Sequence, residues 1–530
     1  MINFTINGKN ISVEPGTTII EAADQNGIFI PRYCYHPALT KAGSCRLCLV
    51  EVEGMPREVI ACATPVTEAM VVLTESEKVK RSRQIVLEFL LLNHPLDCPT
   101  CDKAGECSLQ DFSFDYGNSH SRYKEEKRVP PFKGLGPNIQ LATTRCILCT
   151  RCIRFMEEVA GDTQLGLVHR GSHNEIAVGE NKELDHILAG NVTDICPVGA
   201  LLDKNFIHRT RVWHLENNKA VCGECSSGCN VYIDSYEDSI FRIKPRYNEN
   251  VNGHWICDTG RYAYKKYNDL ERLSIPKIKE NGKYSDSAWD DALKAVRDNF
   301  GKFQKTKGAV AGLVSGSTLN EDAFALKEFL KTFNSSSISG IFQPHAEDDQ
   351  KFKSGFVIKG DKLPNQEGLK FVFELNGPDL FGETILTKIE SGEVKAVYII
   401  HNDLSDIPER TMEALKRLKF LAVEDIVWSP LAEMADVVLP GFTYMEKNGT
   451  FVNYQKRLQL HERAVAGPEG SKNTWDILRR IAGSGANQLQ WFSSSDIFLK
   501  MSKKYPVLND LSHFKLNDKG ILISENKDRN

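Results

Sequence analysis

The chain has 530 residues, of which 41% are apolar and 26% are charged, and its formal net charge is -4. These values are ordinary for a soluble globular protein, and the length is sufficient for several domains with buried cores. The charge gives no basic footprint for nucleic acid, which argues against such a partner. No stretch approaches the roughly 20 apolar residues of a membrane-spanning helix, so we expect membrane contact only through a partner. The N-terminus lacks the layout of a signal peptide, which disfavours export.

Residues 1–77 have the sequence pattern of a β-grasp module. Two strand-like runs are joined by an Asn-Gly turn, and Thr18 with Glu21 forms a capping box that opens a short helix ending at Asn26. The spacing Cys-x10-Cys-x2-Cys-x13-Cys that follows is close to that of ferredoxins with a [2Fe–2S] cluster. Four thiolates also suit tetrahedral zinc, which remains the alternative for this group. The group comprises Cys34, Cys45, Cys48 and Cys62.

Residues 78–118 begin with an amphipathic helix that we expect to end at His94. The ligands of a second cluster gather at its exit. A histidine beside a helix end is more often a cap or a surface residue, but this group has only three cysteines and needs a fourth ligand. We therefore predict that one imidazole and three thiolates hold a [4Fe–4S] cluster. The group comprises His94, Cys98, Cys101 and Cys107.

The third group follows the bacterial ferredoxin layout for a [4Fe–4S] cluster, in which the last cysteine precedes proline. It comprises Cys146, Cys149, Cys152 and Cys196. The fourth group has a looser spacing, which also fits a zinc ribbon. It comprises Cys222, Cys225, Cys229 and Cys257. The fifteen cysteines and one histidine thus fall into four groups of four, with no cysteine left over.

The half of the chain after residue 258 has no cysteine, and strand-like runs alternate there with helical patterns. This alternation predicts a parallel, doubly wound sheet. Strands are expected at 310–314, 371–374, 394–400 and 420–423, and helices at 289–300, 321–333 and 409–418. Neither a Gly-x-Gly-x-x-Gly motif after a strand nor a phosphate-binding loop is present, so we expect no NADH or ATP site on this chain. Residues 516–530 are predicted to be a loosely held tail.

Several longer motifs resemble one protein family. They are NHPLDCPTCDKAGEC at 93–107, CYHP at 34–37, CRLC at 45–48 and TDICPVGA at 193–200. Together they resemble the large iron–sulfur subunit of NADH:quinone oxidoreductase, respiratory complex I, over nearly the whole chain. ADVVLP at 435–440 and EKNGTFVN at 446–453 resemble the molybdopterin oxidoreductase fold that this family inherited.

The resemblance implies a multidomain fold of the α+β and α/β classes. Its parts would be a β-grasp [2Fe–2S] ferredoxin domain at 1–77, a His/Cys3 cluster segment at 78–118, a [4Fe–4S] ferredoxin-like domain at 119–213, a molybdopterin oxidoreductase-type [4Fe–4S] domain at 214–271, a shortened molybdopterin oxidoreductase-like scaffold at 272–483 and a C-terminal tail at 484–530. By the same resemblance, the first group would hold the binuclear cluster. The second and third groups would hold successive tetranuclear clusters of the main wire, and the fourth would hold a side cluster that some members have lost.

Two departures from the catalytic molybdenum enzymes follow from the resemblance. Those enzymes place a lysine two positions after the last cluster cysteine, where this chain has Thr259. The pterin-binding domains are also much shortened, and no cysteine remains to bind molybdenum, although serine or aspartate ligation stays open. We therefore expect no molybdopterin, FMN or NADH on this chain and no catalytic residue.

The function implied by the resemblance is single-electron transfer. Electrons would come from a flavin/NADH-binding subunit with its small [2Fe–2S] partner, and would leave toward the quinone-side iron–sulfur subunits of the peripheral arm. The chain would be peripheral, held by its partners on the cytoplasmic side of a bacterial inner membrane. The main alternative is the catalytic subunit of a soluble NAD-linked formate dehydrogenase, against which Thr259 argues. An iron-only hydrogenase needs further cysteines downstream, and a zinc-stabilised assembly protein is the third alternative.

Overall fold

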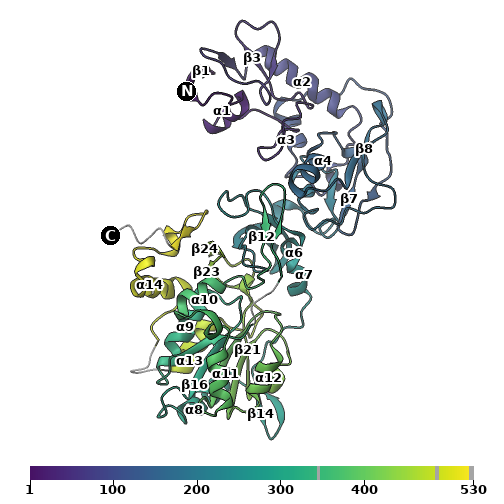
Figure 1. Cartoon of the computed structure of the whole chain (residues 1–530). Coiled ribbons are helices and arrows are strands. Elements are labelled where there is room, and N and C mark those ends of the chain that lie inside the picture. Colours follow the sequence, from purple (N-terminus) through teal and green to yellow (C-terminus); the bar gives the residue numbers. More distant parts are fainter. Residues whose placement is uncertain (343–346, 484–488, 524–530) are drawn as a thin grey trace. The chain divides into compact units, whose positions relative to one another are not determined.

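The computed structural model describes residues 1–342, 347–483 and 489–523. The chain forms two compact units, and each is described by itself (Figure 1). The first unit contains residues 1–215 and 352–356, and the second contains 216–351 and 357–530. Among the helices of the described ranges, none combines the length and the apolar character that crossing a lipid bilayer requires.

The N-terminal part of the first unit is a five-stranded sheet with the order β2-β1-β5-β3-β4. Its elements are β1 (Ile2–Ile6), β2 (Lys9–Val13), α1 (Ile19–Gln25), β3 (Leu49–Val52), β4 (Val59–Ile60) and β5 (Val71–Leu73). The predicted capping box is present, since the backbone N–H of Thr18 donates to the Glu21 carboxylate at 2.9 Å. Helix α1 buries Ile19 and Ile20 in the core below the sheet. Strand β1 is parallel to β5 and antiparallel to β2, as a β-grasp module requires.

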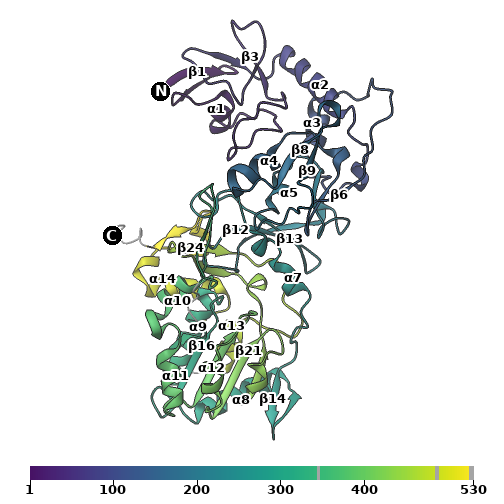
Figure 2. The same ribbon diagram turned by 45° about the vertical axis from the view of Figure 1, so that its right-hand side comes forward.

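The rest of the first unit consists of short elements around long ligand loops (Figure 2). Helix α2 ends at Leu91, three residues before the expected end at His94. The elements are α2 (Glu77–Leu91), η1 (Cys98–Thr100), α3 (Ser108–Tyr116), β6 (Lys133–Gly134), β7 (Ile139–Leu141), α4 (Arg151–Phe155), η3 (Met156–Ala160), β8 (Leu165–Val168), β9 (Glu175–Val178), α5 (Asn191–Ile195) and β10 (Leu201–Asp203). Because so little of this region is regular, the packing of the loops determines where the ligands lie.

The second unit begins with a three-stranded antiparallel sheet that carries the fourth group of cysteines. Its elements are β11 (Glu216–Val221), β12 (Asn230–Tyr236), β13 (Ser239–Pro245), α6 (Asp258–Arg261) and α7 (Ala263–Asn268). Strands β11 and β12 pair from Glu216 with Ser235 to Val221 with Asn230. The connection between them therefore holds Cys222, Cys225 and Cys229 at one end of the sheet.

A seven-stranded sheet with the order β15-β14-β22-β21-β20-β16-β17 forms the body of the second unit. Its strands are β14 (Lys277–Glu280), β15 (Lys283–Asp286), β16 (Val310–Val314), β17 (Ser337–Gly340), β20 (Ala396–His401), β21 (Phe420–Asp425) and β22 (Val437–Pro440). The five strands from β22 to β17 are mutually parallel. The predicted doubly wound sheet is thus confirmed, with β16, β20 and β21 at the expected places.

Helices cover both faces of this sheet (Figure 2). Alternate strand residues, such as Tyr398 and Ile399, belong to different cores because successive side chains of a strand point to opposite faces. One face is covered by α8 (Trp289–Gly301), α9 (Asn320–Lys331) and α13 (Thr474–Ala482), and the other by α11 (Glu383–Glu390) and α12 (Glu409–Leu415). Helices α8, α9 and α12 begin at or within one residue of the predicted starts, and α12 is shorter than expected.

The strand predicted at 371–374 is wrong, because this segment is the end of α10 (Gln366–Phe373). The helix buries Leu369, Val372 and Phe373, which share one helical face. The short run Phe371 to Phe373 is aromatic and β-branched, so its local pattern favours a strand. Packing against α9 decides the outcome in favour of the helix.

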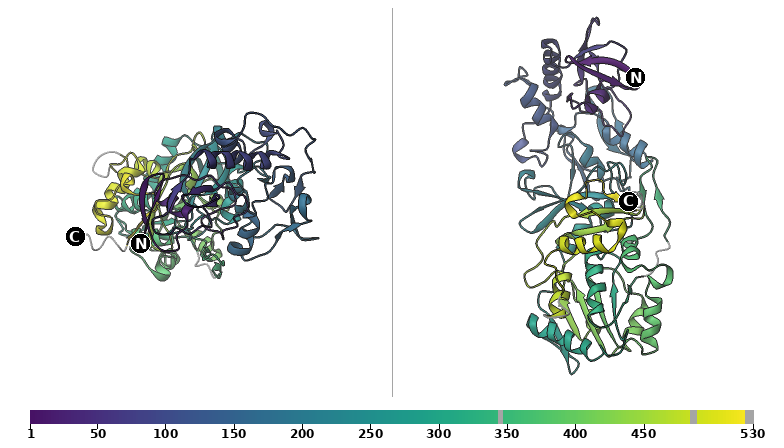
Figure 3. Two further views of the ribbon diagram at one scale, coloured as in Figure 1. Left: turned by 90° about the horizontal axis from the view of Figure 1, so that it is seen from above. Right: turned by 90° about the vertical axis from the view of Figure 1, so that its left-hand side faces the viewer.

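The segment expected to be a C-terminal tail contributes to the core instead. Helix α14 (Ser494–Lys504) buries Ile497, Phe498 and Met501 in the core of the second unit. The yellow C-terminal ribbon lies alongside the green elements of this unit (Figure 3). Strand β25 (Ile521–Leu522) pairs with β24 (Arg457–His461), which itself pairs with β23 (Gly449–Val452). The apolar residues of this segment find partners only in the folded unit, so its polar composition was misleading. Residues 484–488 and 524–530 lie outside the described ranges.

Candidate iron–sulfur cluster sites

The four cysteines of the first group converge at one edge of the N-terminal sheet. The thiol of Cys34 lies within hydrogen-bonding range of those of Cys45 and Cys62. The thiol of Cys48 makes the same kind of contact with Cys62. The hydroxyl of Ser44 and the backbone N–H of Cys45 also donate to Cys34, and together these contacts lower the pKa of the Cys34 thiol. These donors favour the thiolate form of Cys34.

In the second group, the charges of Cys98, Cys101 and Cys107 act on one another. Cys101 and Cys107 are buried, whereas Cys98 is exposed. Burial lowers the pKa of His94 to about 4, which leaves its imidazole neutral near pH 7. The neutral ring is the form that binds a metal.

A salt bridge lies near both His94 and Cys101. Asp97 accepts two hydrogen bonds from Arg145, from Nε at 2.9 Å and from Nη2 at 2.5 Å. The charges of both residues act on His94 and also on Cys101. His94 and Cys101 therefore share this salt bridge as a charged neighbour.

The third group surrounds the start of α4 and the end of α5. The charges of Cys146, Cys149 and Cys196 all act on Cys152. Burial raises the pKa of Cys146 to about 12 and that of Cys149 to about 11. Three buried cysteines and the half-buried Cys146, so close together, can all be thiolates at neutral pH only if a cation compensates their charge. The positive charge of an iron core suits this set of donors.

All four cysteines of the fourth group are buried, and they belong to the second unit. The charges of Cys225, Cys229 and Cys257 act on Cys222, whose pKa burial raises well above its ordinary value. Cys257 caps α6, and its Sγ accepts a hydrogen bond from the N–H of Gly260 at 3.4 Å. All four predicted ligands of this group are thus brought together.

A recurring backbone contact supports the ligand loops. The N–H two residues after a cysteine donates to its sulfur at Cys45, Cys101, Cys107, Cys146 and Cys149. In the loops of Cys45, Cys146 and Cys149, the residues Arg46, Leu148 and Thr150 have positive φ angles of 59°, 53° and 58°. Residues other than glycine rarely adopt a positive φ angle. The free-energy cost of this backbone conformation is typical of functional loops.

No group of three or more His, Cys, Asp or Glu side chains in the described ranges is arranged around a single metal ion.

The second and third groups touch at Gly199, a residue that the ligand pattern did not single out. A Cβ atom added there would lie 2.3 Å from Sγ of Cys101 and 3.2 Å from the Cβ of Lys103. Only glycine therefore allows the chain after Cys196 to approach the second group so closely. The signals in the sequence were its place in the motif TDICPVGA and its position three residues after Cys196.

The first and third groups are joined by residues of α4 and η3. Arg154 donates from Nη2 to the carbonyl oxygens of Cys34 at 2.6 Å and of Cys149 at 3.2 Å. Glu158 accepts a hydrogen bond from the N–H of Thr40 at 2.8 Å. The loop that carries Cys34 is thus fixed on the third group. Sequence reasoning missed Arg154 because nothing in its spacing distinguishes it from a surface arginine.

A pocket of about 330 Å³ lies beside the fourth group, within the second unit. Its wall includes Gly223, Thr259, Ser317 and Asp403. Ser317 and Asp403 follow β16 and β20, at the carboxyl ends of parallel strands, where open α/β sheets usually bind ligands. Thr259 lines this pocket beside the fourth group.

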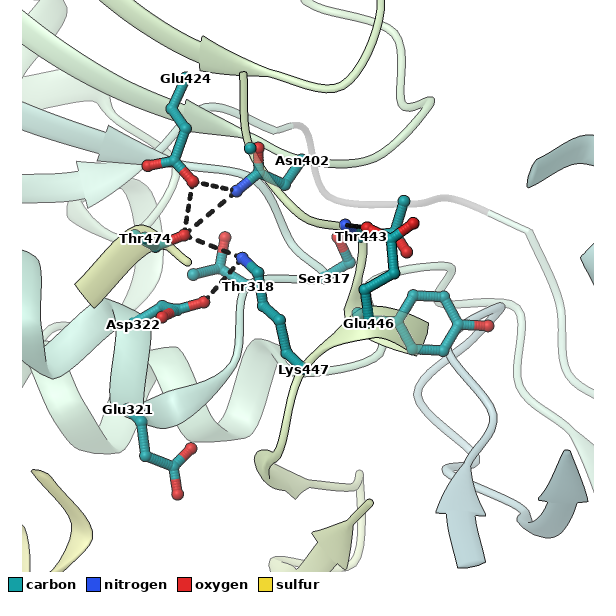
Figure 4. A network of polar contacts seen from close by, with 12 residues as sticks. Ser317, Thr318, Glu321, Asp322, Asn402, Glu424, Thr443, Glu446, Lys447 and Thr474 are labelled. Atoms are coloured by element: carbon teal, nitrogen blue, oxygen red, sulfur yellow. Dashed lines mark hydrogen bonds and ion pairs between the residues drawn. The ribbon is translucent and has the colours of Figure 1, made fainter. Parts of the chain in front are cut away.

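A buried polar network lies near this pocket (Figure 4). Lys447 donates to Asp322 at 2.9 Å and to the hydroxyl of Thr474 at 2.8 Å. Thr474 and Asn402 both donate to Glu424 at 2.5 Å. The ammonium group of Lys447 thus contacts Asp322 directly and reaches Glu424 through the hydroxyl of Thr474. The network therefore helps to hold the interior of the second unit together.

Five family models match successive parts of the chain. They describe a 2Fe-2S iron-sulfur cluster binding domain at 1–77, an NADH-ubiquinone oxidoreductase-G iron-sulfur binding region at 83–122, an NADH-quinone oxidoreductase subunit 3 ferredoxin-like domain at 136–202, an NADH-ubiquinone oxidoreductase NDSU1/NuoG-like 4Fe-4S domain at 225–265, and a molybdopterin oxidoreductase at 272–357 and 366–484. Their order is that of the expected fold classes along the chain.

A full-length relative decides the family. The G subunit of NADH-quinone oxidoreductase from Rickettsia conorii is 32% identical over 98% of this chain and 94% of its own length. The chain belongs to the family of NADH-quinone oxidoreductase G subunits. The mitochondrial 78 kDa subunit of NADH-ubiquinone oxidoreductase from Candida albicans is 30% identical over 91% of this chain and 82% of its own length. A solved NAD+-reducing [NiFe]-hydrogenase structure is 32% identical over 40% of this chain and 91% of that chain, with a TM-score of 0.37.

Membership of this family makes the chain an electron-transfer subunit of complex I, an oxidoreductase. The recognition drawn from the sequence motifs is therefore confirmed. The formate dehydrogenase alternative is not favoured. The iron–sulfur modules expected from the cysteine spacing match the family models for 2Fe-2S and 4Fe-4S domains.

We predict that replacing Gly199 with alanine disrupts the second group. The new methyl would overlap Sγ of Cys101, so the ligand must move. The expected result is the loss of about four irons per chain, the content of one cubane cluster. Gly166→Ala is the matched control, because a Cβ at Gly166 meets nothing within 4 Å. Equal iron contents in the two variants would contradict the prediction.

Proposed function

We propose that this subunit holds one [2Fe–2S] and three [4Fe–4S] clusters on sixteen side chains. The [2Fe–2S] ligands are Cys34, Cys45, Cys48 and Cys62, and the [4Fe–4S] ligands are His94, Cys98, Cys101 and Cys107, then Cys146, Cys149, Cys152 and Cys196, then Cys222, Cys225, Cys229 and Cys257. The observation that carries the proposal is the convergence of the cysteines within each group, together with the neutral state of His94.

The clusters supply one-electron oxidation and reduction, for which no acid, base or nucleophile is needed. The chain's own residues hold the sulfurs, direct N–H groups at them and exclude water. The contacts at Arg154 and Gly199 support a row of sites in the order first, third and second group. The row differs from the order along the chain, in which the second group precedes the third. We propose that the fourth group, which belongs to the other unit, holds a side cluster outside this row.

We further propose the partners and the place of the subunit. A flavin/NADH-binding subunit with its small [2Fe–2S] partner would donate electrons, and the quinone-side iron–sulfur subunits would accept them. The names of the relatives, which are subunits of NADH-quinone oxidoreductases, support this arrangement. The chain would lie at the cytoplasmic side of a bacterial inner membrane, held by these partners. We also propose that the chain consists of six segments, with boundaries after residues 77, 118, 213, 271 and 483.

Metal analysis and low-temperature electron paramagnetic resonance on the anaerobically purified, reduced subunit test the proposal. We expect about fourteen irons per chain, two from a binuclear and twelve from three cubane sites. Zinc in place of iron in any group would overturn the assignment of that group. We also expect no NADH oxidation by the cluster-loaded chain alone. Molybdenum or tungsten in the preparation would instead favour a catalytic pterin enzyme.

A further inference from the structure

The side chain of Arg151 lies between the ligand loops of the first and third groups. Its Nη2 donates to the carbonyl oxygen of Tyr35, the residue after Cys34, at 2.5 Å. Its Nη1 donates to the carbonyl oxygen of Ile195, the residue before Cys196, at 3.1 Å. One planar guanidinium thus spans two loops that are far apart in the sequence.

The third nitrogen of this guanidinium remains available. Nε of Arg151 is buried and has no hydrogen-bond partner among the described residues. A buried N–H without a partner carries a free-energy cost, so such a group usually has a partner in the functional state. The chemistry that suits a buried cationic donor is an anionic acceptor.

The nearby anionic groups belong to two different sites. The thiols of Cys149 and Cys196 act electrostatically on Arg151, and so do those of Cys45 and Cys34. Burial is the largest influence on Arg151 and lowers its pKa, whereas all four sulfurs oppose this shift. A guanidinium nevertheless stays protonated in proteins. A single permanent positive charge therefore faces both ligand groups.

The neighbouring arginine provides a useful contrast. Arg154 uses Nε for the hydroxyl of Thr150 at 3.3 Å and both Nη atoms for carbonyl oxygens of Thr40, Cys34 and Cys149. All three of its nitrogens are thus engaged in holding loops. Arg151 shares the position between the groups but keeps one buried N–H for an additional acceptor.

We propose that Arg151 is a positioning residue that supplies one shared positive charge to the binuclear site and to the third site, and so raises both reduction potentials together. Each site gains one negative charge when it takes up one electron, with no bond or proton transferred. A fixed cation in a weakly polar interior stabilises that charge at both places. Hydrogen bonds to cluster sulfurs act in the same direction. This inference rests on the proposed function.

Redox titrations of the anaerobically purified complex, followed by electron paramagnetic resonance, test the proposal. The two signals are assigned by their loss in the Cys48→Ala and Cys149→Ala proteins. In Arg151→Gln we expect the equilibrium constant for reduction of each site to fall about tenfold. For a one-electron couple, this change lowers the reduction potential by about 59 mV. Arg122→Gln is the matched control, because Arg122 is exposed and pairs with Glu88 on the surface. It should leave both potentials unchanged.

Arg151→Lys keeps the charge but cannot reach both carbonyl oxygens with one ammonium group. It should lower both potentials by a smaller factor than Arg151→Gln, and it decides the question if Arg151→Gln fails to assemble. A shift of only one signal, no shift, or the same shift in Arg122→Gln overturns the inference. Wild-type protein without the two signals would instead overturn the proposed function, so the two failures are distinguishable.

Discussion

Cys149→Ala is expected to remove about four irons per chain, the content of one cubane cluster, and to abolish electron transfer from NADH to quinone in the assembled complex. Cys149 is a buried member of the third group, and the charges of Cys196, Arg151 and Arg154 act on it. A cluster cannot be retained firmly by the three remaining ligands when the lost sulfur leaves an unfilled buried position. The third site also lies between the first and second in the proposed row. The loss of the third cluster therefore interrupts the whole path of electrons along the row.

Iron and sulfide analysis together with NADH:quinone activity of the purified complex measure this effect. Cys48→Ala provides an internal comparison, since it should remove only about two irons from the binuclear site. Ile153→Val is the control on the same helix, because it removes one methyl group from a side chain that is not a ligand. Equal iron losses from Cys48→Ala and Cys149→Ala would contradict the assignment of cluster types. Full iron content in Cys149→Ala would refute its role as a ligand.

Lys447→Met is expected to destabilise the second unit by about 3–5 kcal/mol, the typical cost of removing one partner of a buried ion pair. The side chains of Lys447 and Asp322 are only 5% and 3% exposed. Without the ammonium, the buried Asp322 carboxyl group loses its partner of opposite charge, and Thr474 loses one donor. Burial already raises the pKa of Glu424, whereas the charge of Lys447 lowers it. The substitution therefore affects both carboxylates of the network.

Urea unfolding followed by tryptophan fluorescence measures this loss, because five of the six tryptophans lie after residue 215. Lys416→Met removes an exposed lysine whose pair with Glu413 is 59% and 63% exposed, and it should cost at most about 1 kcal/mol. Adding Asp322→Leu to Lys447→Met should restore part of the lost stability, since the uncompensated charge is then absent. A double variant less stable than Lys447→Met would show that the buried charge is not the cause.

The helical and strand patterns of the second unit were largely predictable from sequence. Residues 289–300 and 310–314 have clear periods, and they form α8 and β16. The strand predicted at 371–374 was wrong because four residues contain too little periodicity to distinguish the end of a buried helix from a strand. The prediction of a tail at 494–504 was wrong because the polar residues around this segment concealed an amphipathic helix that packs against residues distant in the sequence.

The sequence by itself indicated which side chains we propose as cluster ligands, because the spacing of ligands within a loop is a local property. Cys146, Cys149 and Cys152 lie within seven residues, so their convergence needs only one turn of chain. Tertiary structure alone decided which groups are neighbours. Gly199 meets Cys101, and Arg151 meets Tyr35, across separations that no local pattern records. Proximity between groups depends on how loops pack after the chain has folded, since that packing is set by contacts distributed over the whole unit.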